Sequence, residues 1–285
     1  MARPHICFIH AQGLPWGKTD LSRIRPGVAA KLLSHDPDTG ASTQIAAYPA
    51  GYQLPAGQSL RTAEELLILQ GELSIGKVHH NTHCYAYLPA GFKRGAIATA
   101  TGAVVLSMFP GQAEAGPSEA TAALPGLVEQ VDSFAMPWAT GMEGSVTGKP
   151  LSSTLATKLL RRDDASGEQS FLYCSKPHHP PPASVMPGKF THPMIEEIFV
   201  LDGTFVFGDT GIMGPGGYCY WREHQWHGPV GSATGYHLFI RNLGGPLQNQ
   251  FSDQPAPFNF DPPFRPDIPE ELRPYAQAYE PPTRW

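Results

Sequence analysis

The chain has 285 residues, a formal net charge of -5 and 16% charged residues, with 30 glycines and 30 prolines. The small charge and the lack of any Lys/Arg-rich run argue against nucleic acid and anionic membrane surfaces as partners, and no apolar run approaches the roughly 18–20 residues that cross a bilayer. Because Gly and Pro interrupt helices and favour turns, this composition predicts an all-β fold of many short strands.

Neither the N-terminal segment nor the cysteines indicate an exported protein. The apolar stretch within residues 1–10 is broken by histidines, so it does not resemble a signal peptide. Cys7, Cys84, Cys174 and Cys219 are scattered, with no paired spacing. We therefore expect buried, reduced thiols and a cytoplasmic location.

The chain repeats itself. Each apolar stretch is short and rich in β-branched or aromatic residues, as in Ile198 to Val206, which predicts antiparallel strands in a sandwich or barrel. Four matches in one order indicate two copies of one fold. The matched pairs of segments are 14–16 with 136–138, 30–40 with 157–167, 64–71 with 196–203, and 85–95 with 218–228.

Small residues and Pro dominate residues 111–129, which mark the boundary between the copies. We expect an N-terminal domain over residues 1–120, a C-terminal domain over 121–252 and an extended Pro-rich arm over 253–285. The arm carries many aromatic residues, which favours packing on the domains or on a second subunit, with disorder as the alternative.

Two segments of the second copy resemble the motifs of the cupin family. In the first, residues 187–203, His192 stands at the second histidine of a His-x-His pair, Glu196 at the motif's glutamate and Gly203 at its last glycine. In the second, residues 216–229, His227 stands at the metal-binding histidine. The resemblance covers both copies and implies two tandem cupin (jelly-roll-like) β-barrels, with a metal ion bound by these two histidines and the glutamate.

Strand geometry adds a condition to this ligand set. His192 and Glu196 point the same way on a regular strand, but they would then lie about 13 Å apart, too far to share an ion. A bend is therefore required, and Pro193, which cannot donate to a strand ladder, is its natural place.

The first copy does not retain the ligands. Leu60 stands where the second copy has His192, and Arg94 stands where it has His227, so only Glu64 is kept. We therefore expect one divalent metal ion per chain, in the C-terminal cupin only. Arg94 beside Glu64 could form an internal ion pair in place of the ion.

Other histidines leave alternatives open. Phe190 replaces the first histidine of the motif, so either three protein ligands suffice or His224 is a fourth ligand, unless it is an exposed loop residue. His237 on a late strand is expected to be a core residue. The remaining clusters, His178 with His179 and His79, His80 with His83, are interpreted as solvated loops, the former with a lid and the latter with a metal motif as the alternative.

Two histidines and one carboxylate with open positions resemble the facial triad of non-haem iron oxygenases. Fe(II) is favoured, while Zn, Mn or Ni accept similar ligands, and ordinary polar roles for the three residues are the alternative. By resemblance we expect a dioxygenase acting on a small organic substrate in an apolar pocket shaped by Phe190, Trp221 and Trp226. The alternatives are a redox-neutral Zn or Mn lyase, hydrolase or isomerase, and a non-catalytic sensor module. A homodimer is a further expectation.

Overall fold

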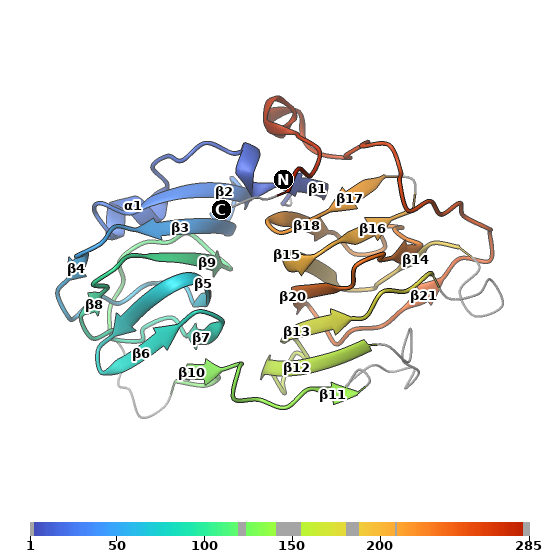
Figure 1. The fold of residues 1–285 in the computed structure, drawn as a ribbon. Coiled ribbons are helices and arrows are strands. Elements are labelled where there is room, and N and C mark those ends of the chain that lie inside the picture. The colour runs from blue at the N-terminus through green and yellow to red at the C-terminus, as the bar shows by residue number, and fades with distance from the viewer. Residues whose placement is uncertain (1–2, 119–123, 141–154, 181–187, 209, 282–285) are drawn as a thin grey trace. The chain divides into compact units, whose positions relative to one another are not determined.

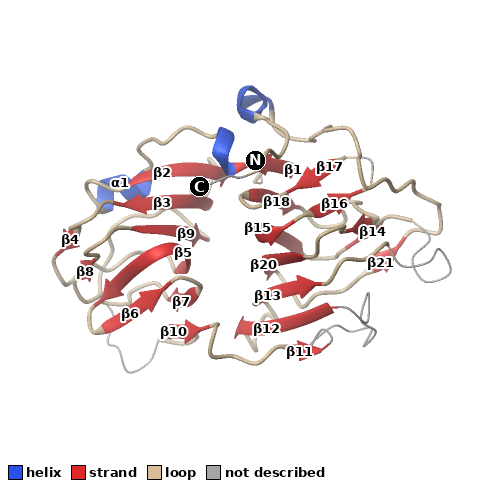
Figure 2. Ribbon diagram, viewed as in Figure 1, coloured by secondary structure: helices blue, strands red, loops and turns tan. Residues whose placement is uncertain are grey.

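The computed structural model describes residues 3–118, 124–140, 155–180, 188–208 and 210–281. Within these ranges the chain is mostly strand, turn and loop (Figure 2), and no helix is long and apolar enough to cross a membrane. The helices found there are short: α1 (Asp20–Ile24), η1 (Ala11–Gly13) and η3 (Glu270–Tyr275).

The chain divides into two compact units. The first is built on Leu14–Met136, and the second combines Pro4–Gly13 with Pro137–Arg284. These limits differ from the ranges expected from the sequence, because a segment from the start of the chain and the C-terminal arm both belong to the second unit.

The main sheet of the first unit is antiparallel, with the strand order β10-β7-β5-β9-β3-β2 (Figure 1). A second group of strands, formed by β4, β6 and β8 with the end of β5, continues from it. The strands are β2 (Ala29–His35), β3 (Ser42–Tyr48), β4 (Gln53–Leu54), β5 (Glu64–Ile75), β6 (Val78–Asn81), β7 (Cys84–Leu88), β8 (Ile97–Ala98), β9 (Ala103–Phe109) and β10 (Val128–Asp132).

The second unit repeats this order. Its main sheet runs β1-β18-β15-β20-β13-β12-β11, with smaller sheets β17-β16-β19 and β14-β21. The strands are β1 (Ile6–His10), β11 (Ala139–Thr140), β12 (Leu155–Arg162), β13 (Gln169–Ser175), β14 (Phe190–Thr191), β15 (Ile195–Gly203), β16 (Phe205–Phe207), β17 (Gly211–Met213), β18 (Gly217–Trp221), β19 (Val230–Gly231), β20 (Tyr236–Leu243) and β21 (Gln250–Phe251).

The duplication extends to irregularities of the strands. The register of β2 with β3 shifts between Leu32 and Ser34, and that of β12 with β13 shifts at the matching place, between Leu159 and Arg161. A second pair of bulges, in β5 and β15, also falls at matched residues. Because a bulge needs an extra residue at one place in a strand, its recurrence shows that the two copies share one backbone plan.

Each unit is organised as an open sandwich. The core of the second unit takes side chains from the main sheet, such as Phe171 and Ile240, and from the small sheet, such as Phe205 and Met213. The chain crosses from one sheet to the other just after Gly203, where β15 ends and β16 begins. Among the described residues, no sheet closes by pairing its first strand with its last. The closed barrels expected from the sequence are therefore not formed by these sheets.

Each main sheet takes its edge strand from the other copy of the sequence. Residues 14–16 match residues 136–138 in sequence, and at the same offset the strand β1 corresponds to β10. Yet β1 pairs with β18 of the second unit, placing Ile6 opposite Tyr220, and β10 pairs with β7 of the first unit, placing Val128 opposite Tyr87. The two copies therefore exchange equivalent strands.

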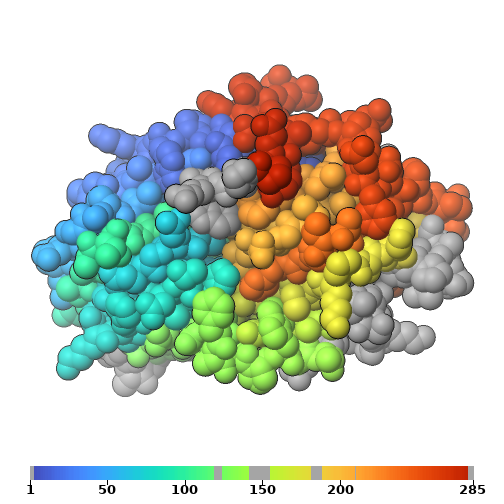
Figure 3. Space-filling model, viewed as in Figure 1, coloured from blue at the N-terminus to red at the C-terminus, as the bar shows by residue number. Residues whose placement is uncertain are grey.

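The C-terminal arm packs on the second unit, where its orange and red atoms lie on the surface (Figure 3). Asp267 exchanges backbone hydrogen bonds with Cys7 of β1, at 2.7 and 2.6 Å. Phe264 packs against the core, and the ring of Tyr279 lies 5.8 Å from that of His10. The arm therefore covers part of the edge that β1 would otherwise expose.

Candidate metal centre

His192 and Glu196 come together because the strand that carries them is interrupted. Strand β14 ends at Thr191, the chain bends at Pro193 and Met194, and β15 begins at Ile195. The Nε2 atom of His192 then lies 3.4 Å from Oε2 of Glu196. The bend expected at Pro193 is therefore present.

His227 lies opposite Phe190, the residue at the position of the motif's first histidine. Its backbone N–H and C=O exchange hydrogen bonds with Phe190, both 2.9 Å long, so their side chains lie together with ring centroids 4.3 Å apart. On its other side the ring of Trp221 packs edge-on at 4.0 Å. Two aromatic side chains thus hold the imidazole in place.

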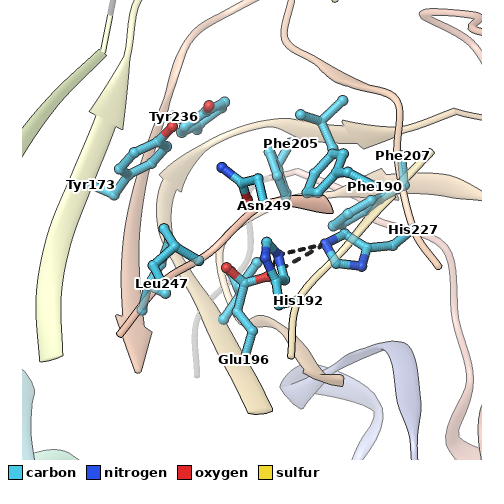
Figure 4. A pocket seen from close by; sticks show the side chains of 13 residues that line it. Tyr173, Phe190, His192, Glu196, Phe205, Phe207, His227, Tyr236, Leu247 and Asn249 are labelled. Atoms are coloured by element: carbon cyan, nitrogen blue, oxygen red, sulfur yellow. Dashed lines mark hydrogen bonds and ion pairs between the residues drawn. The ribbon is translucent and has the colours of Figure 1, made fainter. Parts of the chain in front are cut away.

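The three side chains converge on one point (Figure 4). Nε2 of His227 lies 3.2 Å from Nε2 of His192 and 3.6 Å from Oε2 of Glu196. Two ligand atoms that are each about 2.1 Å from one ion lie about 3.0 Å apart at a right angle and about 3.4 Å apart at the tetrahedral angle. The observed separations therefore suit a single transition-metal ion, and no rearrangement is needed to bind it.

Backbone carbonyls fix the tautomers of both histidines. Nδ1 of His192 lies 2.8 Å from the carbonyl oxygen of Gln248, and Nδ1 of His227 lies 3.0 Å from that of Gln225. Each Nδ1 therefore donates its proton, which leaves each Nε2 with a lone pair. Two lone pairs that face each other repel unless a cation lies between them, so the donor set calls for a metal ion or a proton.

The pKa shifts give the same result for the metal-free site. Burial lowers the pKa of His227, and neighbouring His192 lowers it further, to about 3. Burial alone would also lower the pKa of His192, but the charge of Glu196 and a hydrogen bond to it outweigh burial and raise it. For Glu196, burial would raise the pKa, but the histidines hold it below its usual value. Without metal, a proton on His192 therefore takes the place of the ion.

A small cavity of ≈ 40 Å³ adjoins the three side chains. A buried water needs roughly 10–15 Å³ on this measure, so the cavity admits only a few water-sized groups. Its wall is mostly apolar, with two phenols and one amide. Besides the three candidate ligands it is lined by Tyr173, Phe190, Ile198, Phe205, Phe207, Val230, Tyr236, Ile240, Leu247 and Asn249.

The structure does not bring every sequence candidate to this point. The imidazole of His224 is exposed and lies outside the cluster, although its backbone N–H donates to the carbonyl of His192 over 2.7 Å. Neither Trp221 nor Trp226, which is 48% exposed, lines the cavity, so the pocket role expected for both was wrong. His237 is half-buried, away from the cavity, with its ring 5.5 Å from that of Trp138.

Histidines of the two other clusters form hydrogen bonds within the fold. His79 and His80 lie in β6, not in a solvated loop, and His80 is buried with its ring nitrogens 3.1 and 2.8 Å from two backbone carbonyls. The solvated-loop interpretation was therefore wrong for His80. His178 is bonded through Nδ1 to Ser175, and residues 181–187 of the expected lid lie outside the described residues.

The equivalent position of the first unit is filled by guanidinium groups. Glu64 is fully buried and accepts two hydrogen bonds from Arg25, at 2.7 and 2.5 Å, and one from Arg94 at 3.1 Å. The expected pairing of Arg94 with Glu64 is confirmed. Arg25, which the sequence did not single out, contributes the larger share of the contacts.

Comparison with known proteins gives similarity of structure only: no family model and no curated protein matches the sequence. A putative dioxygenase from Nostoc punctiforme matches with a TM-score of 0.74 and 20% identity, over 88% of this chain and 91% of that one. Oxalate decarboxylase from Lactobacillus farciminis matches with a TM-score of 0.54 and 9% identity, over 86% of this chain and 88% of that one. Oxalate decarboxylase from Bacillus subtilis matches with a TM-score of 0.54 and 11% identity, over 87% of this chain and 78% of that one.

The chain has a cupin-type fold. The histidine–glutamate cluster lies inside this cupin fold, and it is built from the segments that resemble the two cupin motifs. The cavity residues Tyr173, Tyr236 and Asn249 were missed from sequence. Each tyrosine shares its strand face with an apolar residue two positions away, Phe171 for Tyr173 and Leu238 for Tyr236, as core residues do, so no local signal distinguishes them.

Proposed function

We propose that the chain is a non-haem Fe(II) dioxygenase that acts on a small organic substrate. The observation that carries this proposal is the grouping of His192, Glu196 and His227, whose ligand atoms lie within 4.8 Å of one another beside a cavity. Two imidazoles and one carboxylate with open coordination positions are typical of Fe(II) oxygenases. The structural likeness to a putative dioxygenase supports the same reaction class.

Each part of the site has a task in this proposal. The carbonyls of Gln248 and Gln225 orient the imidazoles, and Glu196 neutralises one of the two positive charges. The phenylalanines of the wall exclude bulk water, which strengthens electrostatic contacts within the cavity. When bound, Fe(II) would supply Lewis acidity and electrons for the reaction of substrate with oxygen.

The metal is proposed to bind in the second cupin unit alone, at one ion per chain. In the first unit Arg25 and Arg94 already neutralise Glu64, so no room or charge remains for a cation. A homodimeric assembly, a small-molecule substrate, the lack of nucleic-acid or membrane partners and a cytoplasmic location remain predictions of the sequence.

A redox-neutral reaction with Zn or Mn is the second candidate, because the similar structures include oxalate decarboxylases. Oxygen uptake separates the two. We expect Fe(II)-loaded protein to consume dissolved oxygen with at least one member of a panel of small hydroxy and keto acids, and Glu196→Ala to abolish this uptake.

The contrary result is anaerobic turnover of such an acid by Zn- or Mn-loaded protein at a rate that Fe(II) does not improve. Binding of an acid without turnover, whichever metal is supplied, would instead identify a sensor module. Elemental analysis of protein purified without a metal-affinity tag should find close to one ion per chain, and two tightly bound ions would contradict the assignment to one unit.

A further inference from the structure

One part of the cavity wall is polar, and it adjoins the phenylalanines where the ring of Tyr236 lies 4.8 Å from that of Phe205. The hydroxyls of Tyr173 and Tyr236 are hydrogen-bonded to each other, and burial raises the pKa of both phenols, so both stay neutral. Figure 4 draws the side chain of Asn249 between these tyrosines and the imidazole of His192. This wall can form hydrogen bonds, but it adds no charge.

Asn249 has an unused acceptor in this wall. Its Oδ1 atom is buried and accepts no hydrogen bond from any described residue. A buried acceptor is normally satisfied. Because Asn249 lines the cavity, a small rotation of its amide would offer this acceptor to a group that enters. The backbone around Asn249 is held in place by its neighbours. The carbonyl of Gln248 accepts a hydrogen bond from His192, and Leu247 lines the wall.

The charge of the site limits what can enter. Among the described residues that line the cavity, Glu196 is the one acid and none is Lys or Arg. A divalent ion beside Glu196 gives a net charge of +1. A monoanion makes the site neutral, whereas a dianion leaves a buried negative charge with no partner, which is costly.

We infer that the ligand of this cavity is a small monocarboxylate with a hydrogen-bond donor next to its carboxylate. The carboxylate binds the ion, the donor binds Oδ1 of Asn249, and dianions of the same shape are rejected. This inference rests on the proposed function, because it needs the ion at His192, Glu196 and His227. The cavity volume of ≈ 40 Å³ confines the ligand to a few non-hydrogen atoms.

Oxamate and oxalate provide a matched test, because both are small and planar and they differ by one charge and one donating group. Co(II)-loaded protein reports ligand binding through its visible absorption, without any turnover. We expect oxamate to bind at least about tenfold more tightly than oxalate. Charge attraction to a divalent ion alone favours the dianion oxalate. Tighter binding of oxamate would therefore be due to the side chains that line the cavity.

Asn249→Leu keeps the size of the side chain and removes the acceptor. We expect it to weaken oxamate binding about tenfold or more, with oxalate binding and Co(II) affinity unchanged. The matched control is Asn259→Leu in the same unit, where the amide is exposed and bonded to Asp261, and where neither anion should bind differently.

The outcomes separate the inference from the function on which it rests. If Co(II) fails to bind at His192, Glu196 and His227, the proposed function and the inference both fail. If Co(II) binds but oxamate does not, or oxalate binds as tightly, only the ligand class is overturned. If Asn249→Leu lowers Co(II) affinity itself, Asn249 is a metal ligand and its assigned role is wrong.

Discussion

Glu64 and Glu196 stand at matched positions of the two copies, and both are buried, at 0% and 6% exposure. A buried carboxylate must have positive charge beside it. Glu64 has two guanidinium groups, while Glu196 has two imidazoles, which carry charge only when protonated or when a metal ion lies between them. The neighbours of one carboxylate therefore decide which unit can hold an ion.

Removing any one of the three candidate ligands should abolish tight metal binding. We expect His192→Ala, His227→Ala and Glu196→Gln each to weaken Co(II) binding by more than about tenfold, because each leaves only two donors. His224→Asn is the control. It lies in the loop before His227 with an exposed ring, and Asn tolerates its φ of 60°. Isothermal titration measures all four, and loss of affinity in His224→Asn would make His224 a ligand after all.

Two properties of the site should change with pH in opposite directions: the stability that His192 contributes in metal-free protein, and the affinity of the site for metal. The pKa of His192 is raised above 6.5, so in metal-free protein its protonation adds stability below the unfolded pKa, and this stability is lost as pH rises through the folded pKa. Metal binding requires the deprotonated imidazole and should weaken as pH falls through the same range. An NMR titration of the His192 ring in metal-free protein tests this, because His227, whose pKa is lowered to about 3, gives stability that rises with pH through 6.5 and masks the effect in a melting temperature. A folded-state pKa of His192 below 6.5 would contradict the sign.

The Glu64 network should be sensitive to its two arginines in a definite order. Arg25→Met leaves Glu64 with one weaker partner, and we expect a loss of about 3–5 kcal/mol in the free energy of unfolding. Arg94→Met should cost less, since it leaves a neutral pair with two hydrogen bonds. Arg23→Met, on the exposed side of α1, is the control.

Acid should weaken the same network. Burial alone would raise the pKa of Glu64, but Arg25 and Arg94 hold it below its usual value. Its stabilising contribution is therefore present above the unfolded pKa and is lost as pH falls through the folded pKa. Urea denaturation at decreasing pH should show this loss in the parent protein and a smaller one in Arg25→Met. An equal effect of all three arginine substitutions at neutral pH would contradict the network.

At the scale of elements, the crossing from β15 to β16 depends on one glycine. Gly203 has a φ of 73°, and a Cβ atom there would lie 2.1 Å from the carbonyl oxygen of Gly235. We expect Gly203→Ala to destabilise the protein by about 1–3 kcal/mol or more, because both the backbone conformation and the contact become strained.

Gly244→Ala is the matched control for Gly203. Its φ is 85°, but nothing lies within 4 Å of its Cβ position, so only the conformational part of the penalty remains. The difference between the two variants in urea denaturation isolates the close approach of the backbones. If both substitutions cost the same, the contact at Gly235 contributes nothing.

The elements were the most predictable part of the molecule. Short apolar segments bounded by Gly and Pro predicted the strands, and the position of Pro193 predicted the bend that brings His192 to Glu196. The contacts of Arg25 with Glu64 could not be predicted, because Arg25 follows the end of α1, lies 39 residues before Glu64 and belongs to no motif. The carbonyl of Gln248 that orients His192 is a main-chain group, which side-chain identity does not reveal.

At the scale of the whole molecule, the second unit requires the first residues of the chain. Deleting residues 2–13 removes β1, exposes the edge of β18 and uncovers Trp221, which packs on His227. We expect the backbone amides of β18 to lose hydrogen-exchange protection, while those of β7, which pairs with β10, keep it. Unchanged protection in β18 would show that β1 contributes little to this unit.

The exchange of β1 and β10 also bears on how a duplicated chain evolves. A single copy of this sequence would carry a strand with no sheet to join and a sheet with an uncovered edge, and two identical copies would satisfy each other as a symmetric dimer does when it swaps arms. Fusion of the copies places that reciprocity within one polypeptide. The first copy can then differ at the ligand positions, as at Leu60 and Arg94, and still be needed, because the unit with the candidate metal ligands takes its edge strand from it.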